Sequence, residues 1–304
     1  MDQFFRTFKH ISRRQTVFTV FVALTVCIGA QAQTVHDSIF IGTDYRTFHY
    51  MQPARTAAPK HLIFILHGSG GHGTAMMREA SSLLSISRQE HLLLVFPDGY
   101  KRFWNECRKA SGAEANLLDV DEQSFFLSLI RRFAAQYGTD TTTAFAVGFS
   151  GGGHMAYKLA LTLPERFKGI TAVVANLPDS VNMDCTASGK PVSVMIANGT
   201  ADEINPYNGG EVVIPNVKLG TVRSTVQTMR YWAALVGYSG APQKESLNDT
   251  IPSDGISINR YTFASNGKKE VVLLEVVNGT HKAPPGMDIF IESWEFFRRQ
   301  IPYE

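Results

Sequence analysis

The sequence predicts an α/β fold, with a mostly parallel central sheet covered by helices on both faces. Short β-rich runs alternate along the chain with stretches of helical periodicity, the pattern of parallel strands joined by crossover helices. Several strand candidates are continuous apolar runs, as expected for strands buried on both faces. The 304 residues are 44% hydrophobic and only 18% charged, so the chain can bury a sizeable core.

The first 32 residues form a different kind of segment. A basic stretch precedes an apolar run at residues 17–28, and Ala30-Gln31-Ala32 provides an A-x-A cleavage site. This order predicts a secretory signal peptide over residues 1–32 and one domain over residues 33–304. We therefore expect a secreted protein, either extracellular or periplasmic.

Two other interpretations of this segment are weaker. A permanent membrane anchor would need roughly 20 apolar residues, and the run is shorter than that. A lipid anchor on Cys27 is disfavoured because bulky Val26 precedes it, where a small residue is expected.

Charge and cysteine content limit the classes of partner. Cleavage would leave 25 basic and 26 acidic residues, so we expect no nucleic-acid partner. We also expect a monomer, with no stable membrane insertion after the signal peptide is removed. Cys107 and Cys185 would remain, and an even pair in an oxidising compartment is a candidate disulfide. Two free buried thiols are the alternative.

The elements expected in the first half begin with an antiparallel hairpin. Buried strands then alternate with helices, and the second helix starts with acidic residues that suit its dipole. The expected ranges are strands at 38–42, 46–51, 61–66 and 92–96, and helices at about 74–89 and at 121–137.

The second half continues the alternation and contains the segment with the clearest chemistry. The expected ranges are strands at 143–147, 170–175, 192–197 and 271–276, and helices at 152–161, 222–235 and 287–299.

A serine stands between the strand at 143–147 and the helix that follows it. The run Gly148-Phe149-Ser150-Gly151-Gly152 has the form G-x-S-x-G, which is weak evidence alone because many chains contain it by chance. In the order strand, G-x-S-x-G, helix, the serine sits on a sharp turn that only small neighbours tolerate. This context predicts Ser150 as the nucleophile on an elbow of the α/β-hydrolase type.

Such a serine needs a base and an orienting carboxylate further along the chain. Only His154 and His281 follow Ser150. His154 lies on the helix that leaves the elbow and would point away, as a packed or surface residue. His281 lies between a strand and the last helix, so we predict it as the base. Asp202 follows the strand at 192–197 and is the predicted acid, with Glu203 as a solvated neighbour.

An acyl-transfer site also needs donors for the developing oxyanion. The loop Leu66-His67-Gly68-Ser69-Gly70-Gly71 follows the first buried strand. The backbone N–H of Ser69, or that of Gly70, and the N–H of Gly151 are the predicted donors. A phosphate cradle is the alternative, but the loop lacks the lysine and spacing of the phosphate-binding motifs.

These motifs together resemble the secreted polyhydroxybutyrate depolymerase-like and feruloyl esterase family, which overlaps carbohydrate esterase family one. The resemblance covers about residues 38–300. The segments that carry it are His67-Gly68-Ser69-Gly70-Gly71, Phe96-Pro97-Asp98-Gly99, Asp119-Val120-Asp121, Gly148 to Ala156, Gly199-Thr200-Ala201-Asp202, Pro206 to Gly210 and Trp232-Ala233.

The resemblance implies an α/β-hydrolase that cleaves carboxylic esters through a serine triad, without a metal or organic cofactor. By position, Ser150 is the nucleophile, Asp202 the acid and His281 the base. Cys107 and Cys185 match two cysteines that family members often carry. The tryptophan that often follows the family's histidine is absent here, which leaves a preference for aromatic acids open.

The sequence thus predicts a secreted serine esterase that takes small or oligomeric esters. Candidate substrates are feruloyl or acetyl esters of plant polysaccharide and hydroxyalkanoate oligomers. The alternatives are a peptidase on the same fold and an inactive scaffold used for binding. The complete set of triad residues disfavours the scaffold.

Overall fold

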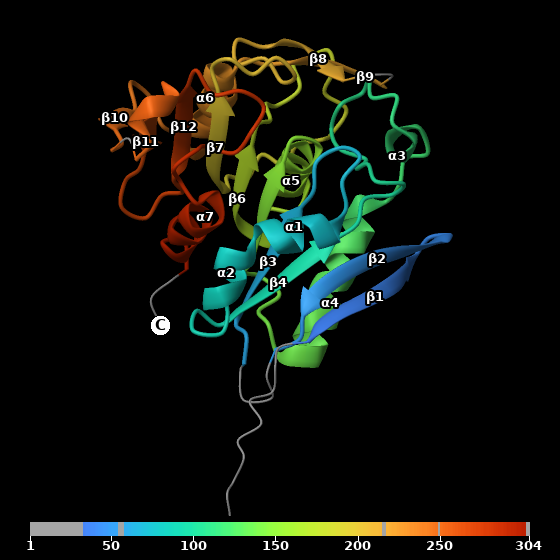
Figure 1. Cartoon of the computed structure of the whole chain (residues 1–304). Coiled ribbons are helices and arrows are strands. Elements are labelled where there is room, and N and C mark those ends of the chain that lie inside the picture. Colours follow the sequence, from blue (N-terminus) through green and yellow to red (C-terminus); the bar gives the residue numbers. More distant parts are fainter. Residues whose placement is uncertain (1–32, 54–57, 215–216, 249, 302–304) are drawn as a thin grey trace, which may run out of the picture. The chain divides into compact units, whose positions relative to one another are not determined.

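The computed structural model describes most of the chain after residue 32 (Figure 1). The described ranges are 33–53, 58–214, 217–248 and 250–301. The predicted signal peptide, residues 1–32, lies outside the described residues. None of the helices in the described ranges is long and apolar enough to cross a membrane.

Ten strands form the central sheet. Their bounds are β1 Thr34–Ile41, β2 Asp44–Met51, β3 His61–Leu66, β4 Leu92–Pro97, β5 Ala144–Phe149, β6 Phe167–Val173, β7 Ser193–Gly199, β10 Gln243–Ser246, β11 Ser257–Phe263 and β12 Val271–Val277. A separate hairpin consists of β8 Gly210–Ile214 and β9 Val217–Val222.

The strand order of the sheet is β1-β2-β4-β3-β5-β6-β7-β12-β11-β10. The inner strands from β4 to β12 are all parallel. The pairs at the two edges are antiparallel. This arrangement confirms the predicted α/β class, and it brings the carboxyl ends of β5, β7 and β12 to the same edge of the sheet (Figure 1).

Helices cover both faces of the sheet. Their bounds are α1 Gly73–Glu79, α2 Ser81–Ile86, α3 Glu114–Leu117, α4 Glu122–Tyr137, α5 Gly151–Thr162, α6 Thr225–Val236 and α7 Ile289–Arg298, with a short 3-10 turn at Pro252–Asp254. Apolar residues of α4, α5 and α6 pack into one core, and those of α1, α2 and α7 pack into a second.

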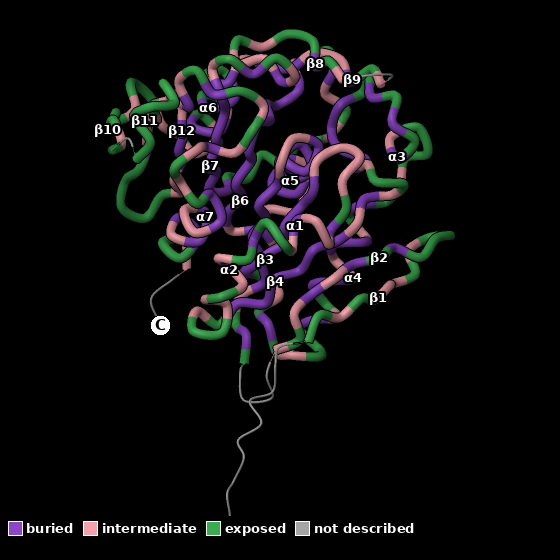
Figure 2. Tube along the Cα trace, viewed as in Figure 1, coloured by how far each residue is buried: buried purple, intermediate pink, exposed green. Residues whose placement is uncertain are grey.

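Burial explains why the inner strands form where the sequence predicts them. In β3 (HLIFIL) and β4 (LLLVFP), nearly every side chain is buried, because each strand has helices over both faces. The inner strands appear as a buried band in Figure 2, whereas β10 at one edge is exposed throughout and β1 at the other edge has no buried residue. Continuous apolar runs therefore mark the centre of the sheet.

Two predicted helices have different bounds in the structure. The segment expected to be helical at about 74–89 forms two helices that end at Ile86, because Ala80 leaves the helical conformation (φ −83°, ψ 23°) and separates α1 from α2. The helix expected from residue 222 begins at Thr225. Ser224 caps it in a capping box with Gln227, and Val222 belongs to β9.

Candidate active site

The turn between β5 and α5 has the geometry of a nucleophile elbow. Ser150 takes φ 51° and ψ −115°, in a region that non-glycine residues seldom occupy. A Cβ atom at Gly148 would lie 2.0 Å from the Gly152 carbonyl oxygen, and one at Gly152 would lie 2.4 Å from the Leu66 carbonyl oxygen. The tight crossing of backbone segments explains why the two glycines flank the serine.

Asp202 and His281 are in hydrogen-bond contact. His281 Nδ1 lies 2.8 Å from Asp202 Oδ2 and 3.0 Å from Oδ1. The backbone N–H groups of Ile204 and Asn205 donate to Asp202 Oδ1 at 2.9 and 2.8 Å, so the carboxylate is held from two sides. Its side chain is fully buried, whereas that of His281 is 18% exposed. A buried carboxylate with these partners can fix the orientation of the imidazole.

Backbone contacts bring the loops of Asp202 and His281 together. The Ala201 N–H donates to the Gly279 carbonyl oxygen at 2.9 Å, and the Thr200 N–H donates to the Val276 carbonyl oxygen at 2.9 Å. A Cβ atom at Gly199 would lie 2.1 Å from the Gly279 carbonyl oxygen. These contacts hold the loop after β7 against the loop after β12.

Ser150 follows β5 and lies at the same edge of the sheet. Among the described residues, its hydroxyl makes no hydrogen bond to His281. Catalytic hydrogen bonds of this kind often tighten only when substrate binds. Of the three predicted triad residues, the structure therefore joins Asp202 to His281 and presents Ser150 on the same edge.

The loop after β3 lies against the start of α5. A Cβ atom at Gly151 would lie 3.0 Å from the Ser69 backbone nitrogen, so the two backbones are nearly in contact. Gly151 is the first residue of α5, where an N–H has no intrahelical acceptor. The Gly70 N–H donates to the Arg102 carbonyl oxygen at 2.9 Å. Because the Gly70 N–H already has an acceptor, the Ser69 N–H is the candidate oxyanion donor beside that of Gly151.

His67 holds this loop in place, a role that the sequence did not reveal. Its Nε2 accepts a hydrogen bond from the Gly99 N–H at 2.9 Å, and its Nδ1 lies 2.8 Å from the Gly68 carbonyl oxygen. These partners require the neutral ring with the proton on Nδ1. Burial lowers the pKa of His67, although its hydrogen bond to Gly68 opposes the shift. The Trp104 indole N–H donates to the His67 carbonyl oxygen at 2.9 Å.

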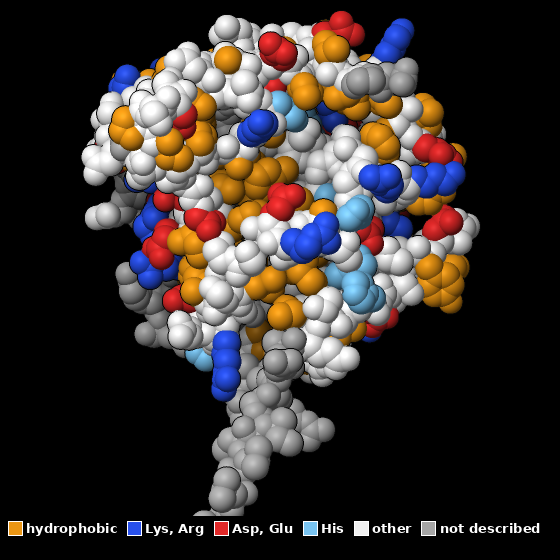
Figure 3. Space-filling model, viewed as in Figure 1, with side chains coloured by type: hydrophobic (Ala, Val, Ile, Leu, Met, Phe, Trp, Pro, Cys, Tyr) orange, Lys and Arg blue, Asp and Glu red, His pale blue; other side chains and the backbone are white. Residues whose placement is uncertain are grey.

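Asp98, in the segment that follows β4, also has a structural role. Burial opposes its ionisation, but hydrogen bonds from His49, the Gly73 N–H and Thr47 outweigh burial and lower the pKa of the carboxyl group to about 2. The His49 ring also lies against that of His36, and histidine side chains gather on the face drawn in Figure 3. Asp98 thus ties β2 to the start of α1.

His154 is packed inside the protein, one helical turn after Ser150. It is 2% exposed, and its Nδ1 has no hydrogen-bond partner among the described residues. Burial holds the pKa of His154 well below its usual value, and the charges of Arg108 and His281 lower it further. His154 is therefore a neutral residue of the core. Of the two roles expected from the sequence, a packed residue or a surface residue, the structure shows the packed one.

Cys107 and Cys185 form a disulfide with a Cα–Cα distance of 5.0 Å. The two segments also share backbone contacts, since the Lys109 N–H donates to the Asn182 carbonyl oxygen at 2.7 Å. The bond joins the segment after β4 to the segment before β7.

Two charged residues beside Cys107 are buried, which sequence reasoning missed. Arg108 Nε donates to Glu106 Oε1 at 2.8 Å, and both side chains are 2% exposed. Burial raises the pKa of the Glu106 carboxyl group, and the Arg108 charge opposes this shift. Together with Ser69 and Gly151, the pair lines a narrow crevice that has no room for a water molecule. The sequence gives one sign of this burial: Glu106 and Arg108 flank Cys107, which forms the disulfide.

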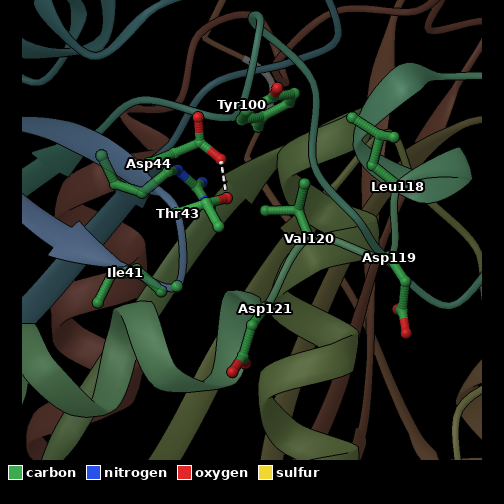
Figure 4. Close-up of a pocket in the computed structure, with 10 residues that line it drawn as sticks. Ile41, Thr43, Asp44, Tyr100, Leu118, Asp119, Val120 and Asp121 are labelled. Carbon is green, nitrogen blue, oxygen red and sulfur yellow. Dashed lines mark hydrogen bonds between the residues drawn. The ribbon is translucent and has the colours of Figure 1, made fainter.

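A larger cavity lies between the β1–β2 turn and the segment before α4 (Figure 4). Three aspartates and Tyr100 line it. Asp121 is occupied as the N-cap of α4, where it accepts the Ser124 N–H, and Asp119 accepts a hydrogen bond from Asn105 Nδ2. Asp44 lies within hydrogen-bond distance of the Thr43 hydroxyl at 2.9 Å. The acidic groups of this cavity therefore already have structural partners.

Several known proteins are similar to this chain. Residues 120–230 match the phospholipase/carboxylesterase family. The chain is 26% identical to "Putative esterase NocK" of Nocardia uniformis subsp. tsuyamanensis, over 84% of this chain and 76% of that protein. It is 25% identical to "Probable feruloyl esterase C" of Aspergillus clavatus, over 78% of this chain and 76% of that protein.

Other matches are partial or show only the fold. The match to "Probable feruloyl esterase C" of Aspergillus flavus, at 28% identity, covers 50% of this chain and 52% of that protein, so the chain spans about half the length of that relative. The solved acetyl xylan esterase from Aspergillus awamori has a TM-score of 0.60 at 15% identity, covering 88% of this chain and 99% of that one. Together with the elbow and the parallel sheet, these relatives identify the chain as a carboxylic ester hydrolase of the α/β-hydrolase superfamily.

Proposed function

We propose that the protein is a serine esterase in which Ser150, His281 and Asp202 act as a catalytic triad. The observation that carries this proposal is the 2.8 Å contact between His281 Nδ1 and the buried Asp202 carboxylate. With Nδ1 turned to Asp202, Nε2 is the ring nitrogen left to accept a proton. The strained elbow conformation of Ser150 supports its assignment as the nucleophile.

The proposed reaction has two steps. The Ser150 hydroxyl oxygen attacks the ester carbonyl carbon while its proton passes to His281 Nε2. The backbone N–H groups of Ser69 and Gly151 stabilise the oxyanion. The intermediate collapses to the acyl-enzyme, and the leaving alcohol takes the proton from His281. Water then attacks the acyl-enzyme by the same route and releases the acid and free Ser150.

The proposed substrates are feruloyl or acetyl esters of plant polysaccharide, and hydroxyalkanoate oligomers. The names of the relatives support the first two classes, since they include feruloyl esterases and an acetyl xylan esterase. Incubation with each natural ester, followed by measurement of released ferulate, acetate and 3-hydroxybutyrate, would rank the three. Release of none of these acids would contradict the proposed substrate classes.

The serine mechanism is tested with p-nitrophenyl acetate. We expect the Ser150→Ala variant to lose activity by a factor on the order of 10³ or more, because removal of a triad member leaves only binding and the oxyanion donors. Equal rates for this variant and the unmodified protein would contradict the mechanism.

We also propose that the protein is exported. The basic, apolar and A-x-A order of residues 1–32 supports export, as does the disulfide of Cys107 and Cys185. The protein recovered from the periplasm or the medium should then begin at Gln33, as measured by N-terminal sequencing. Retention of the uncleaved chain in the cytoplasm would contradict export.

A further inference from the structure

Two imidazole nitrogens meet on one face of the β1–β2 hairpin. His36 and His49 are cross-strand partners in its antiparallel register, and their Nδ1 atoms lie 2.5 Å apart. This distance is short even for a hydrogen bond between two ring nitrogens. The His36 side chain is exposed, and that of His49 is partly buried. Each ring therefore directs one nitrogen to a shared point at the surface.

Asp98 determines which nitrogen of His49 carries a lone pair. Although burial opposes its ionisation, hydrogen bonds lower the pKa of the Asp98 carboxyl group to about 2. The ionised group accepts the Nε2–H of His49 at 2.8 Å. A neutral imidazole has only one N–H, so the Nδ1 atom of His49 is left with a lone pair that faces His36. Metal-binding histidines are commonly supported in this way, by a carboxylate on the other ring nitrogen.

Two thioether sulfurs lie beside the histidine pair. Met51 Sδ and Met77 Sδ are 3.5 and 3.8 Å from the Thr34 hydroxyl oxygen. Thr34 and Met51 are cross-strand partners, two positions along the register from His36 and His49. Because side chains two positions apart on a strand share a face, both pairs lie next to each other on the same side of the hairpin.

Helix α1 brings Met77 to this side of the hairpin. A Cβ atom at Gly73 would lie 2.9 Å from His49 Cδ2, so the start of α1 touches the His49 ring. Met77 is four residues further along α1 and therefore on the same face of the helix. His36, His49, Met51 and Met77 together form a histidine–methionine cluster, which offers two imidazole nitrogens and two thioether sulfurs.

We propose that the histidine–methionine cluster binds one copper(I) ion through both Nδ1 atoms and the thioether sulfurs. Imidazole and thioether ligands together favour a soft ion such as copper(I), whereas magnesium and calcium prefer oxygen ligands. The ion takes the place of the proton between the two rings, and the His36 proton moves to Nε2. None of the cluster residues belongs to the proposed triad, so the site does not depend on the esterase mechanism.

Binding requires a small movement of the two rings. With a metal–nitrogen distance of about 2.0 Å and tetrahedral angles, the two Nδ1 atoms would lie about 3.3 Å apart. They must therefore separate from the 2.5 Å seen in the structure. Asp98 holds His49, so His36 is the ring expected to move, as its exposed side chain allows.

Silver(I) is the probe for the first test, because it is soft like copper(I) and does not change its oxidation state in the titration. The reference protein carries Cys27→Ser and no histidine tag. Its other two cysteines, Cys107 and Cys185, are joined in a disulfide, so it has no free thiol to compete for silver. Titration calorimetry in chloride-free buffer should show one silver ion bound per chain.

The His36→Gln variant tests the imidazole ligands. It should bind silver about ten-fold more weakly or worse, because one of the two nitrogens is lost. The His91→Gln variant is the matched control, since His91 is another exposed histidine and lies outside the cluster. It should bind silver as the reference protein does. Equal affinity of His36→Gln and the reference protein would overturn the proposal.

The double variant Met51→Leu/Met77→Leu tests the thioether ligands at nearly constant side-chain volume. Silver affinity should fall about ten-fold, whereas binding of zinc, which has little preference for thioethers, should be unchanged. Met76→Leu is the control, because Met76 is a buried neighbour on the same helix. Unchanged silver affinity in the double variant, or an equal loss of silver and zinc binding, would contradict thioether ligation.

Thermal unfolding of the reference protein gives a measurement that needs no cluster variant. An ion that binds only the folded chain stabilises it, so one equivalent of silver nitrate should raise the melting temperature. The same addition of sodium nitrate should leave it unchanged. If silver neither raises the melting temperature nor binds in the titration, the proposal is wrong, and the contact between the rings is only a hydrogen bond.

Discussion

At the scale of single residues, the surroundings of each histidine set its role. His281 has one ring nitrogen on a buried carboxylate and remains partly exposed to solvent, as a base that meets substrate must be. His67 uses both ring nitrogens in hydrogen bonds and holds a loop. His154 is buried with its Nδ1 unpaired among the described residues. The same side chain therefore serves as candidate base, loop anchor and core residue.

His154 should make the protein sensitive to mild acid. In the unfolded chain it takes up a proton below about pH 6.5, whereas in the folded protein burial keeps its pKa well below that value. Its contribution to stability is therefore present above about pH 6.5 and is lost as the pH falls below it. We expect the melting temperature of the unmodified protein to drop more steeply between about pH 7 and pH 5 than that of His154→Gln.

The exposed His91 supplies the control for this experiment. The His91→Gln variant should follow the unmodified protein over the same pH range. Parallel melting curves for the unmodified protein and His154→Gln would contradict the assignment of His154 as a buried neutral residue.

The sequence predicted the candidate triad better than its surroundings. Ser150, Asp202 and His281 could be predicted because each follows a recognisable strand and their chain order suits the fold. The burial of Arg108 could not be predicted, because a charged residue between Cys107 and Lys109 is expected to be exposed to solvent. Its burial results from tertiary packing around the disulfide, which no local pattern encodes.

At the scale of elements, the turn from β5 into α5 depends on close backbone contacts. Gly148, Gly151 and Gly152 each approach another backbone segment so closely that a Cβ atom would lie 3.0 Å or less from it. The glycines allow α5 to start immediately after Ser150, so the serine remains at the sheet edge. Side chains at these positions would push the helix away from the loop after β3.

A methyl group at Gly152 should disrupt this turn. Its Cβ would lie 2.4 Å from the Leu66 carbonyl oxygen, and backbone on both sides cannot easily yield. We expect Gly152→Ala to lower the free energy of unfolding by about 2 to 3 kcal/mol in urea denaturation. Gly112→Ala is the control, since its Cβ would meet nothing closer than 3.8 Å. Similar unfolding midpoints for the two variants would contradict this account of the elbow.

Elements at the centre of the sheet were easier to predict than those at its edges. The inner strands are runs of apolar residues because both of their faces are covered. β8 and β10 are short and mostly exposed, so their sequences contain no comparable signal, and they were not predicted. A local break such as the one at Ala80 depends on how two short helices pack, which helical periodicity does not reveal.

At the scale of the whole molecule, the sheet carries the candidate site at one edge, and a disulfide ties two of its connections together. The Cys107–Cys185 bond spans 78 residues of sequence, including β5, α5 and β6. It therefore encloses the segment that presents Ser150. Cys107 is almost completely buried, so the bond also forms part of the core.

Loss of this bond should destabilise the entire domain. Closing a loop of this length restricts the unfolded chain, so we expect Cys107→Ala/Cys185→Ala to lose about 2 to 4 kcal/mol of unfolding free energy. Urea denaturation of the variant and of the unmodified protein would measure the difference. The unmodified protein with dithiothreitol is the control, and it should unfold near the variant. A variant as stable as the oxidised protein would contradict this role.

Covalent labelling measures directly whether Ser150 is a nucleophile activated by His281 and Asp202. The folded protein is treated with diisopropyl fluorophosphate, digested with trypsin and analysed by mass spectrometry. We expect one adduct, on Ser150 in the peptide that ends at Lys158. We also expect labelling to be slower by a factor on the order of 10³ in Asp202→Asn, where the imidazole loses its orienting carboxylate. An adduct on a different serine, no adduct, or equal labelling rates in the two proteins would contradict the proposed triad.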